Sequence, residues 1–313
     1  MNRLMKNGLL ALVCMAMAGG VVACGDDDNE GGGGSGGVGG TGGTGGTGGT
    51  GGTGGTGGTG GTGECAAVAP LDVSGVATIN PLAAAILPEA AVPSVEGLTV
   101  RVVDPIKLLS SPQNPEAATL AQGTVANDGT FSFTGLDLKD VTTGLVVTLA
   151  DATGTNFVTS TQALCVGVQD AEGCLTECRL AATGATFTAF AVPTAFNAAL
   201  QTGLEDDQLL ANGYVLGVAT TGAAPISGVT INPESANVTY LDADASGLKA
   251  ATGTTTTALG AFVAQPGGIT ELSASKTGTT FVPASQPVGS TPGVAFQVFF
   301  VGTEAGGGTA AAQ

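Results

Sequence analysis

Cysteine is the residue type in this chain that could carry the most chemistry. Four cysteines lie beyond residue 60: Cys65, Cys165, Cys174 and Cys178. Cys174 and Cys178 lie in the short run Cys-Leu-Thr-Glu-Cys, whose spacing suits either zinc ligation or a disulfide framework. The chain has no histidine, and a fourth thiolate would have to come from the distant Cys65. For an exported chain, as argued below, we predict two disulfides of undetermined pairing and no metal site.

An acidic run at residues 242–247, Asp-Ala-Asp-Ala-Ser-Gly, is the second candidate. Asp242, Asp244 and Ser246 fall at positions one, three and five of a calcium-binding loop, with Gly247 at position six. Position twelve, where such a loop needs a bidentate glutamate, is glycine. A polar loop between strands is the favoured interpretation, and calcium binding by Asp242 and Asp244 stays open.

Other groupings that support catalysis are missing from the sequence. Without histidine there is no Ser-His or Cys-His pair and no imidazole metal ligand. Glu205, Asp206 and Asp207 are adjacent carboxylates, but this arrangement is typical of an exposed helix start. The long glycine run lacks the lysine of a phosphate-binding loop. We predict a protein that is not an enzyme, with no catalytic residues and no cofactor.

The composition limits both partners and fold class. The chain carries 25 acidic and 8 basic residues, a formal net charge of −17. Such a surface repels nucleic acid, so we expect no nucleic-acid partner. Glycine, threonine, valine and alanine are abundant and helical patterns are few, which favours short strands joined by tight turns.

The first 24 residues have the three parts of a secretory signal peptide. Arg3 and Lys6 form a positive start, and the apolar run from Leu9 to Ala23 follows without a charge. This run is shorter than the roughly 20 residues that a membrane-spanning helix needs. We therefore predict export of the chain.

The run Val21-Val22-Ala23-Cys24 resembles the lipobox of bacterial lipoproteins. The resemblance implies that residues 1–23 are removed and that diacylglycerol is attached to the Cys24 thiol. An ordinary signal peptide with a cysteine at its cleavage site is the alternative. Two or more acyl chains bind a bilayer firmly, so the implied partner is the lipid bilayer, through acyl chains on Cys24.

The residues after Cys24 are similar to lipoprotein sorting signals. Gly25, rather than aspartate, follows the cysteine, which by resemblance to Gram-negative sorting favours the outer membrane. The acidic run at 26–28 resembles a surface-export signal, with a solvated start to the following segment as the alternative. The expected location is the bacterial outer membrane or cell surface.

Residues 24–64 are predicted to be a disordered tether. They contain eight Gly-Gly-Thr triplets at 39–62 and almost no apolar side chains. Such a segment cannot bury enough surface to offset the entropy of ordering. Collagen is excluded because two of three positions are glycine and proline is absent. A flexible coil of this length spans roughly 35 Å on average.

From residue 65 onward, apolar residues alternate with threonine and serine, and glycine or Asn-Asp punctuates them. This pattern predicts β-strands. The segments concerned are 98–104, 130–133, 144–151, 228–231, 237–242, 260–264 and 295–302. We predict a mainly β protein.

The chain also repeats itself, which predicts two related domains. VEGLTV (95–100) matches ISGVTI (226–231), and NDGTFSF (127–133) matches ALGAFVA (258–264). GTNFV (154–158) likewise matches GTTFV (278–282). The first two landmarks are separated by the same 32 residues in both copies, Gly97 to Gly129 and Gly228 to Gly260.

This pattern of glycine, threonine and phenylalanine resembles the carboxypeptidase regulatory-like domains, small transthyretin-like or carbohydrate-binding-like β-sandwiches. The matching residues are Gly97, Thr99, Val100, Gly129 and Phe131, and then Gly228, Thr230, Ile231, Gly260 and Phe262. The first copy has no clear opening strand before residue 95. Phe131 and Phe262 alternate with polar residues, so we expect both in a sandwich core.

The expected domains are a first sandwich with disulfides at 65–190, a helical connector at 191–212, a second sandwich at 213–303 and a disordered tail at 304–313. Thr194 is expected to cap the helix and Gly213 to end it, and its expected apolar face consists of Ala195, Ala198, Ala199, Leu209 and Leu210. The predicted function is display of these domains for structural, adhesive or protein-interaction use. A carbohydrate-binding module is the alternative, although tryptophan is absent and Tyr214 and Tyr240 are the only tyrosines.

Overall fold

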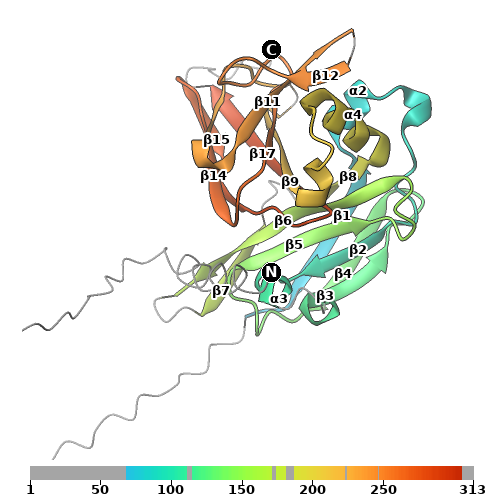
Figure 1. Ribbon diagram of the computed structural model, residues 1–313. Coiled ribbons are helices and arrows are strands. Elements are labelled where there is room, and N and C mark those ends of the chain that lie inside the picture. Colours follow the sequence, from blue (N-terminus) through green and yellow to red (C-terminus); the bar gives the residue numbers. More distant parts are fainter. Residues whose placement is uncertain are drawn as a thin grey trace, which may run out of the picture. The chain divides into compact units, whose positions relative to one another are not determined.

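Two β-sandwiches follow one another along the chain (Figure 1). A computed structural model describes residues 68–110, 115–170, 174–180, 187–222, 224–245 and 247–304. The chain divides into two units, Met1–Glu64 and Cys65–Gln313, and all described residues belong to the second unit. Among them, no helix has the length and apolar character that crossing a bilayer requires. The predicted signal peptide, Cys24, the tether and the tail after Glu304 lie outside the described residues.

The first sandwich has two layers. One layer comprises β4 (Thr130–Leu136), β1 (Leu71–Ile79) and β8 (Phe187–Pro193), in that order. The other comprises β3 (Thr119–Thr124), β2 (Thr99–Val103), β5 (Gly144–Ala150), β6 (Phe157–Gln169) and β7 (Leu175–Leu180). β6 first pairs with β8 and then with β5, so it joins the two layers. Their inner faces enclose a core that includes Val100, Phe131 and Leu149.

The second sandwich repeats this plan with additions. Its larger layer contains β12 (Gly247–Ala250), β11 (Val238–Asp244), β13 (Ala261–Ala264), β9 (Tyr214–Thr220), β17 (Val294–Glu304) and β15 (Thr279–Val282). Its smaller layer contains β10 (Thr230–Asn232), β14 (Thr270–Ser275) and β16 (Ser285–Val288). Phe262, Phe281 and Phe300 are part of the core between the layers.

The structure confirms the internal repeat at the level of single hydrogen bonds. The Gly97 amide donates to the Val125 carbonyl at 2.9 Å, and the Gly228 amide donates to the Thr256 carbonyl at 2.8 Å. The Gly129 and Gly260 carbonyls accept from Ala77 and Ala219, both at 2.8 Å. Gly129 and Gly260 also have positive φ angles, +83° and +62°, which residues other than glycine rarely adopt.

The opening strand that the first copy seemed to lack is β1, at residues 71–79. β1 and β9 share the tetrapeptide Gly-Val-Ala-Thr, at 75–78 and 217–220. Each lies between two strands of its layer, antiparallel to one (β4 or β13) and parallel to the other (β8 or β17). Gly75 lies opposite Phe131, and Gly217 lies opposite Phe262. The repeat therefore starts about 20 residues earlier than the matched landmarks indicated.

The helical connector is confirmed, but its predicted cap is wrong, and its apolar face is confirmed only for Ala199, Leu209 and Leu210, which are buried or pack against the core. It consists of α4 (Thr194–Leu204) and α5 (Leu209–Asn212). The N-cap of α4 is Pro193, so the Thr194 hydroxyl makes no capping bond. Phe196 and Leu200 are fully buried, whereas Ala195 and Ala198 are exposed, because the bulkier side chains occupy the core. Gly213 ends α5 as predicted.

The acidic triplet lies between these two helices rather than at a helix start. Glu205 caps the C-terminus of α4 with φ +54°. Asp206 accepts hydrogen bonds from the Gln208 amide at 3.0 Å and from Gln265 Nε2 at 2.9 Å. The triplet therefore shapes the turn that leads into α5.

Further short helices occur where the sequence did not predict them. They are α2 (Pro81–Ile86), α3 (Pro105–Ser110), η1 (Glu89–Ala91), η2 (Pro115–Ala118) and η3 (Glu234–Ala236). Asn80 caps α2 by accepting from the Leu82 and Ala83 amides, and proline follows it at the first helical position. α2, α4 and α5 pack on a third core that includes Val192, Tyr214, Leu216 and Leu241.

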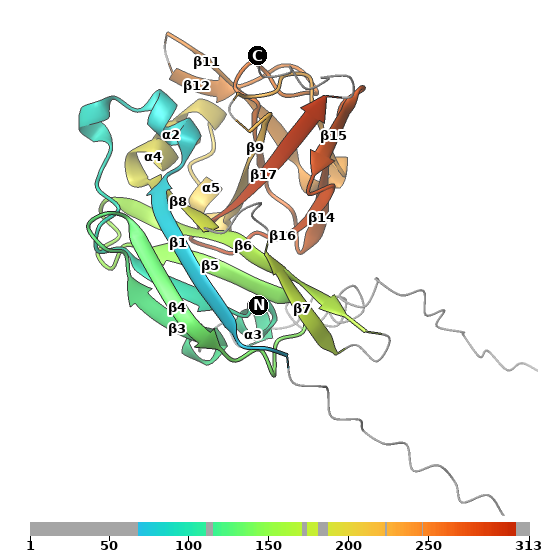
Figure 2. The same cartoon turned by 180° about the vertical axis from the view of Figure 1, so that it is seen from behind.

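The two sandwiches share a hydrogen-bonded sheet. β17 of the second sandwich lies parallel to β6 of the first, from Val294 opposite Thr159 to Gln297 opposite Gln162. β17 also pairs with β9, so the larger layers continue into one another. Figures 1 and 2 show β6 beside the start of β17, below the second sandwich.

Candidate functional site

Cys165 and Cys178 form a disulfide across the antiparallel strands β6 and β7, with their Cα atoms 5.4 Å apart. Cys174 is also disulfide-bonded. Its partner lies outside the described residues, as does Cys65. Thiols that are consumed in disulfides cannot act as nucleophiles or metal ligands. Within the described ranges, no group of three or more cysteine, aspartate or glutamate side chains is placed to hold a metal ion.

Asp242 and Asp244 lie on a β-hairpin rather than in a calcium loop. They belong to β11, which pairs with β12 so that Asp242 is opposite Lys249. Asp244 forms an ion pair with Lys249, with Oδ2 and Nζ 2.8 Å apart. This hydrogen bond, with the charge of Asp244, raises the pKa of Lys249. The extended strand and the lysine counter-ion favour the interpretation that these residues are polar hairpin residues.

Both tyrosines, the only candidates for a sugar-stacking platform by type, are buried. Tyr214 is fully buried and its hydroxyl donates to Asn197 Oδ1 at 3.0 Å. Burial raises the pKa of Tyr214. Tyr240 is 6 % exposed, and its hydroxyl oxygen accepts from the Ile231 amide at 2.8 Å. All 13 aromatic residues of the chain lie within the described ranges, and none of them is exposed.

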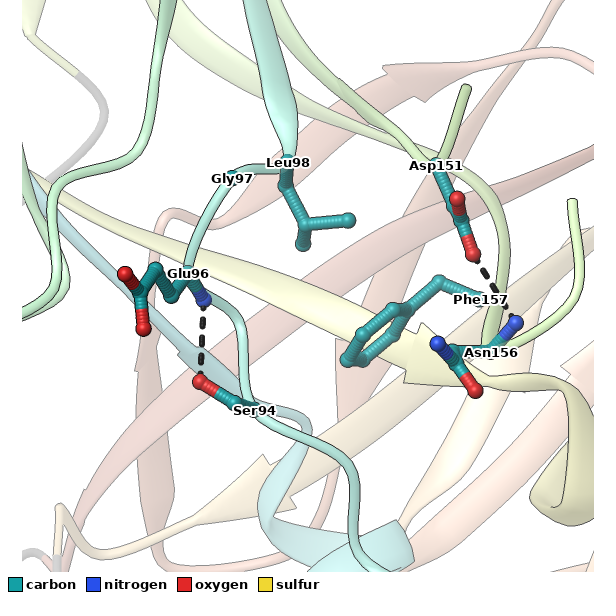
Figure 3. Close-up of a pocket in the computed structure, with 7 residues that line it drawn as sticks. All are labelled: Ser94, Glu96, Gly97, Leu98, Asp151, Asn156 and Phe157. Atoms are coloured by element: carbon teal, nitrogen blue, oxygen red, sulfur yellow. Dashed lines mark hydrogen bonds between the residues drawn. The ribbon is translucent and has the colours of Figure 1, made fainter. Parts of the chain in front are cut away.

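A small cavity of about 70 Å³ opens where two turns of the first sandwich meet (Figure 3). One turn contains Ser94 and Glu96, and the other runs from Asp151 to Asn156. Leu98 and Phe157 lie between the turns. The Glu96 amide donates to the Ser94 hydroxyl at 3.2 Å, so this polar contact shapes its own turn.

The cavity's second carboxylate is used to hold its loop. Asp151 Oδ2 accepts from the Asn156 amide at 2.8 Å, and Oδ1 accepts from both the amide and the hydroxyl of Thr153 at 2.8 Å. These bonds, led by that from the Asn156 amide, lower the pKa of Asp151 to about 2. At neutral pH this group is a fixed anion that closes a turn, and it is not poised to transfer protons.

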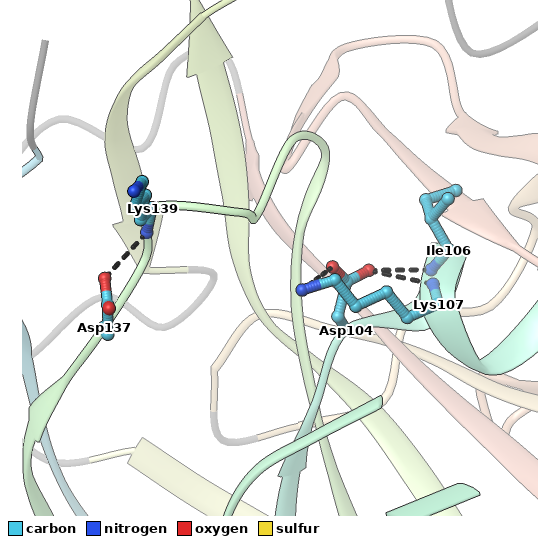
Figure 4. A network of polar contacts seen from close by, with 5 residues as sticks. All are labelled: Asp104, Ile106, Lys107, Asp137 and Lys139. Carbon is cyan, nitrogen blue, oxygen red and sulfur yellow. Dashed lines mark hydrogen bonds and ion pairs between the residues drawn. The ribbon is translucent and has the colours of Figure 1, made fainter. Parts of the chain in front are cut away.

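A second polar network also serves local structure (Figure 4). Asp104 is 2 % exposed, and its Oδ1 accepts from the Ile106 and Lys107 amides at 2.9 and 3.2 Å. The Lys107 ammonium lies 3.9 Å from Oδ2. Asp104 therefore caps α3, and Asp137 forms a comparable turn by accepting from the Lys139 amide at 2.9 Å. Neither aspartate is placed as a catalytic group.

A buried polar contact joins the two sandwiches. Asn80 and Gln297 are both fully buried, and Asn80 Nδ2 donates to Gln297 Oε1 at 2.6 Å. The side-chain Nε2 of Gln297 donates to the Phe190 carbonyl of β8, which also accepts from Ser160 Oγ at 2.9 Å. These side chains come from β17, β6 and the end of β1, and sequence patterns do not reveal such pairs because isolated polar residues carry no periodic signal.

Comparisons with known proteins give little. No protein-family model matches, and no curated protein matches. Among solved structures, the minor pilin GBS52 of Streptococcus agalactiae aligns at 10% identity, with 74% of this chain and 95% of that chain covered and a TM-score of 0.21. The shaft pilin SpaA of Lactobacillus rhamnosus GG aligns at 11% identity, with 74% and 97% covered and a TM-score of 0.20. At such scores, neither the fold described above nor the proposals below depend on these similarities.

Proposed function

We propose that the protein is a bacterial lipoprotein that displays two joined β-sandwiches for protein contacts at the outer membrane or cell surface, without enzymatic activity. The observation that carries the proposal is the run Val21-Val22-Ala23-Cys24 after a positive start and an apolar segment. Acyl chains on Cys24 would hold the chain to the bilayer. The Gly-Gly-Thr run between Cys24 and the sandwiches would act as a flexible spacer.

The described surface supports a binding or structural role over catalysis. Asp104 is buried, and hydrogen bonds lower the pKa of Asp151 and of Asp128. These carboxylates cap a helix and close turns. Carbohydrate binding receives less support, because a sugar platform needs an exposed aromatic ring and every ring of this chain is at least partly buried. We therefore favour a protein as the partner.

Mass spectrometry of the mature amino terminus tests the anchor. The expected result is a chain that begins at acylated Cys24, and a Cys24→Ser variant should be released from the membrane fraction. An unmodified Cys24 or a start elsewhere would overturn the lipid anchor. Protease treatment of intact cells then tests display, because surface-exposed sandwiches are shed by cleavage in the glycine-rich run, whereas a periplasmic protein is protected.

A further inference from the structure

The clearest unexplained feature of the described surface is the outer edge of β4. This strand pairs with β1 alone among the described strands, although it is seven residues long (Figure 2). It contains no charged residue and no proline, two of the devices that protect an exposed edge, and its register shift with β1 falls near its end, between Phe133 and Leu136. Thr130, Ser132 and Thr134 are exposed along it.

The backbone groups that face outward can be identified from the pairing with β1. The Gly129 carbonyl accepts from Ala77 of β1, and peptide groups alternate in direction along a strand, so Phe131 also faces β1. Ser132 therefore directs its amide and carbonyl groups away from β1, and the Thr134 amide also points away, just before the register shift between Phe133 and Leu136. No hydrogen bond to these outward groups occurs within the described part of the chain. At Thr130 the edge is closed, because Ala126 and Asp128 bond its backbone.

The second sandwich shows the same edge with a strand on it. β13 is the counterpart of β4, and Val263 and Gln265 occupy the positions of Ser132 and Thr134. β11 pairs with β13 so that Thr239 lies opposite Val263, and the Gln265 amide donates to the Ala236 carbonyl at 3.0 Å. All four residues of β13 are buried, whereas among the matching residues of β4 Thr130 and Ser132 are exposed, Phe133 is half-buried and only Phe131 is buried.

In the first sandwich the strand that could cover this edge pairs elsewhere. β3 leads into β4 as β11 and β12 lead into β13, but β3 pairs with β2 of the opposite layer. The repeat thus provides, within one chain, both the occupied and the vacant form of one edge. We propose that the outer edge of β4, at Ser132 and Thr134, binds an extended segment of a partner protein as an added antiparallel strand.

The side chains around the edge define the chemistry of that segment. In the second sandwich, Tyr240 lies opposite Phe262 and fills the core beside it. Two residues of the incoming segment, two positions apart, would lie opposite Phe131 and Phe133. Both would face the first core in the same way, so both should be apolar. The residue between them would lie opposite Ser132 and face solvent. An apolar, polar, apolar triplet is therefore expected.

Charge at the ends of β4 selects a basic segment over a second copy of this chain. Asp128 precedes the strand and Asp137 follows it, both exposed. Two copies of β4 paired antiparallel about Ser132 or Phe133 would bring Asp128 of one copy near Asp137 of the other, which is repulsive. The chain's net charge of −17 adds to this cost. Lysine or arginine at the ends of the incoming segment would instead be attracted, and the interaction does not depend on the lipid anchor.

The test uses the full chain in detergent micelles and a peptide that imitates β11. The peptide Lys-Asn-Val-Thr-Tyr-Leu-Lys contains the residues 237–241 with a lysine at each end, and a fluorescent label allows binding to be followed by anisotropy. In the matched control peptide, proline replaces the central threonine, which removes one backbone donor. Saturable binding of the first peptide, at least about tenfold tighter than that of the second, is expected.

Variants of the protein separate backbone pairing from other contacts. Ser132→Pro removes the outward amide and should weaken binding by at least about tenfold, whereas Ser132→Ala keeps the amide and should bind like the parent. If Ser132→Pro proves unstable, Ser132→Lys takes its place. This exposed change leaves the amide intact, and the added charge should repel the basic peptide. Asp128→Asn keeps an oxygen for the Thr130 amide and should weaken binding about two- to threefold at low salt.

Several outcomes would overturn the proposal. Equal binding of both peptides, or unchanged binding by folded Ser132→Pro and Ser132→Lys proteins, would exclude strand addition at β4. Sedimentation equilibrium of the full chain should show one copy per particle. If the chain forms a dimer that Ser132→Pro dissociates, the occupant of the β4 edge is a second copy of this chain and not a partner segment.

Discussion

Two glycine–phenylalanine pairs are the residues on which the repeated fold depends most directly. Gly75 lies opposite Phe131, and Gly217 lies opposite Phe262, in equivalent places of the two sandwiches. A Cβ atom added at Gly217 would overlap the Phe262 ring, and one added at Gly75 would overlap the Phe131 ring. The rings of Phe131 and Phe262, 6 % and 0 % exposed, therefore occupy the space that a side chain at the facing glycine would need. Glycine is required here for space rather than for a special backbone angle.

Removal of the ring should relieve the cost of a methyl group at the facing glycine. Phe262→Ala should lower the free energy of unfolding by about 3–5 kcal/mol, and Gly217→Ala by about 1–3 kcal/mol through overpacking. In the double variant, Gly217→Ala should cost clearly less, because its methyl group occupies part of the space that the ring has left. Urea titration of the four proteins measures this coupling. Strict additivity of the two losses would contradict the packing.

The Asp151 turn should make stability depend on pH. The pKa of Asp151 falls from 3.8 to about 2 on folding, so its contribution is present above pH 3.8 and is lost as the pH falls toward 2. Asp151→Asn removes one strong acceptor and should cost about 1 kcal/mol at pH 7, discounted because the group is partly exposed. Near pH 2 the variant and the parent should differ little.

Thermal unfolding at several pH values measures this effect. Asp137→Asn, at a carboxylate that accepts one backbone bond at 2.9 Å, is the control and should change stability by less than about 0.5 kcal/mol at pH 7. A stability difference for Asp151→Asn that stays constant from pH 7 to pH 2 would show that the charge has no role.

At the scale of elements, the hairpin of β6 and β7 depends on its disulfide. The strands pair from Cys165 opposite Leu180 to Gln169 opposite Leu175, and the far end of β6 extends beyond its pairing with β5. On β7, Leu175 is buried in the first core, whereas Thr176, Glu177 and Arg179 are exposed, so apolar burial holds only the start of this strand. The covalent link between Cys165 and Cys178 supplies what packing does not.

Replacing both cysteines should therefore loosen this hairpin. The link closes a segment with a sequence separation of 13, and its removal in Cys165→Ser/Cys178→Ser should cost about 2–3 kcal/mol. Hydrogen exchange of β7 amides should accelerate strongly, whereas the amides of β9 and β13 should change only by the global loss. Unchanged protection in β7 would mean that its backbone pairing alone is sufficient.

Several strands with an alternating pattern could be predicted from the sequence, although β1, which also alternates, was missed. All seven predicted strand segments correspond to strands. β9 was missed because both of its faces are covered, which leaves an apolar run containing glycine rather than an alternation. β3, β12 and β16 are short and contain glycine or proline, and neighbouring strands rather than propensity hold them in place. Of the candidate site, the cysteines could be predicted, but the vacant edge of β4 depends on how strands from the two layers pair.

At the scale of the whole folded unit, the two sandwiches should behave as one body. The parallel pair β6–β17 and the buried contact between Asn80 and Gln297 join them. Phe190 of the first sandwich also lies against Phe299 of the second, with ring centroids 4.5 Å apart. A rigid junction would hold the edge of β4 in a fixed orientation relative to the second sandwich.

The junction predicts a single unfolding transition. Tyr214 and Tyr240, the only tyrosines, both lie in the cores packed around the second sandwich, so tyrosine fluorescence reports that half. Far-UV circular dichroism reports both halves, and the two signals should change at one midpoint.

Gln297→Leu removes one hydrogen-bond partner from the Phe190 carbonyl and one from Asn80 Nδ2, which should cost about 1–3 kcal/mol and lower both midpoints together. Gln122→Leu on the exposed side of β3 should change the free energy of unfolding by less than about 0.5 kcal/mol and leave both midpoints close to those of the parent. A tyrosine transition that moves alone in Gln297→Leu, or a parent that unfolds in two steps, would mean that the sandwiches fold independently despite their shared sheet.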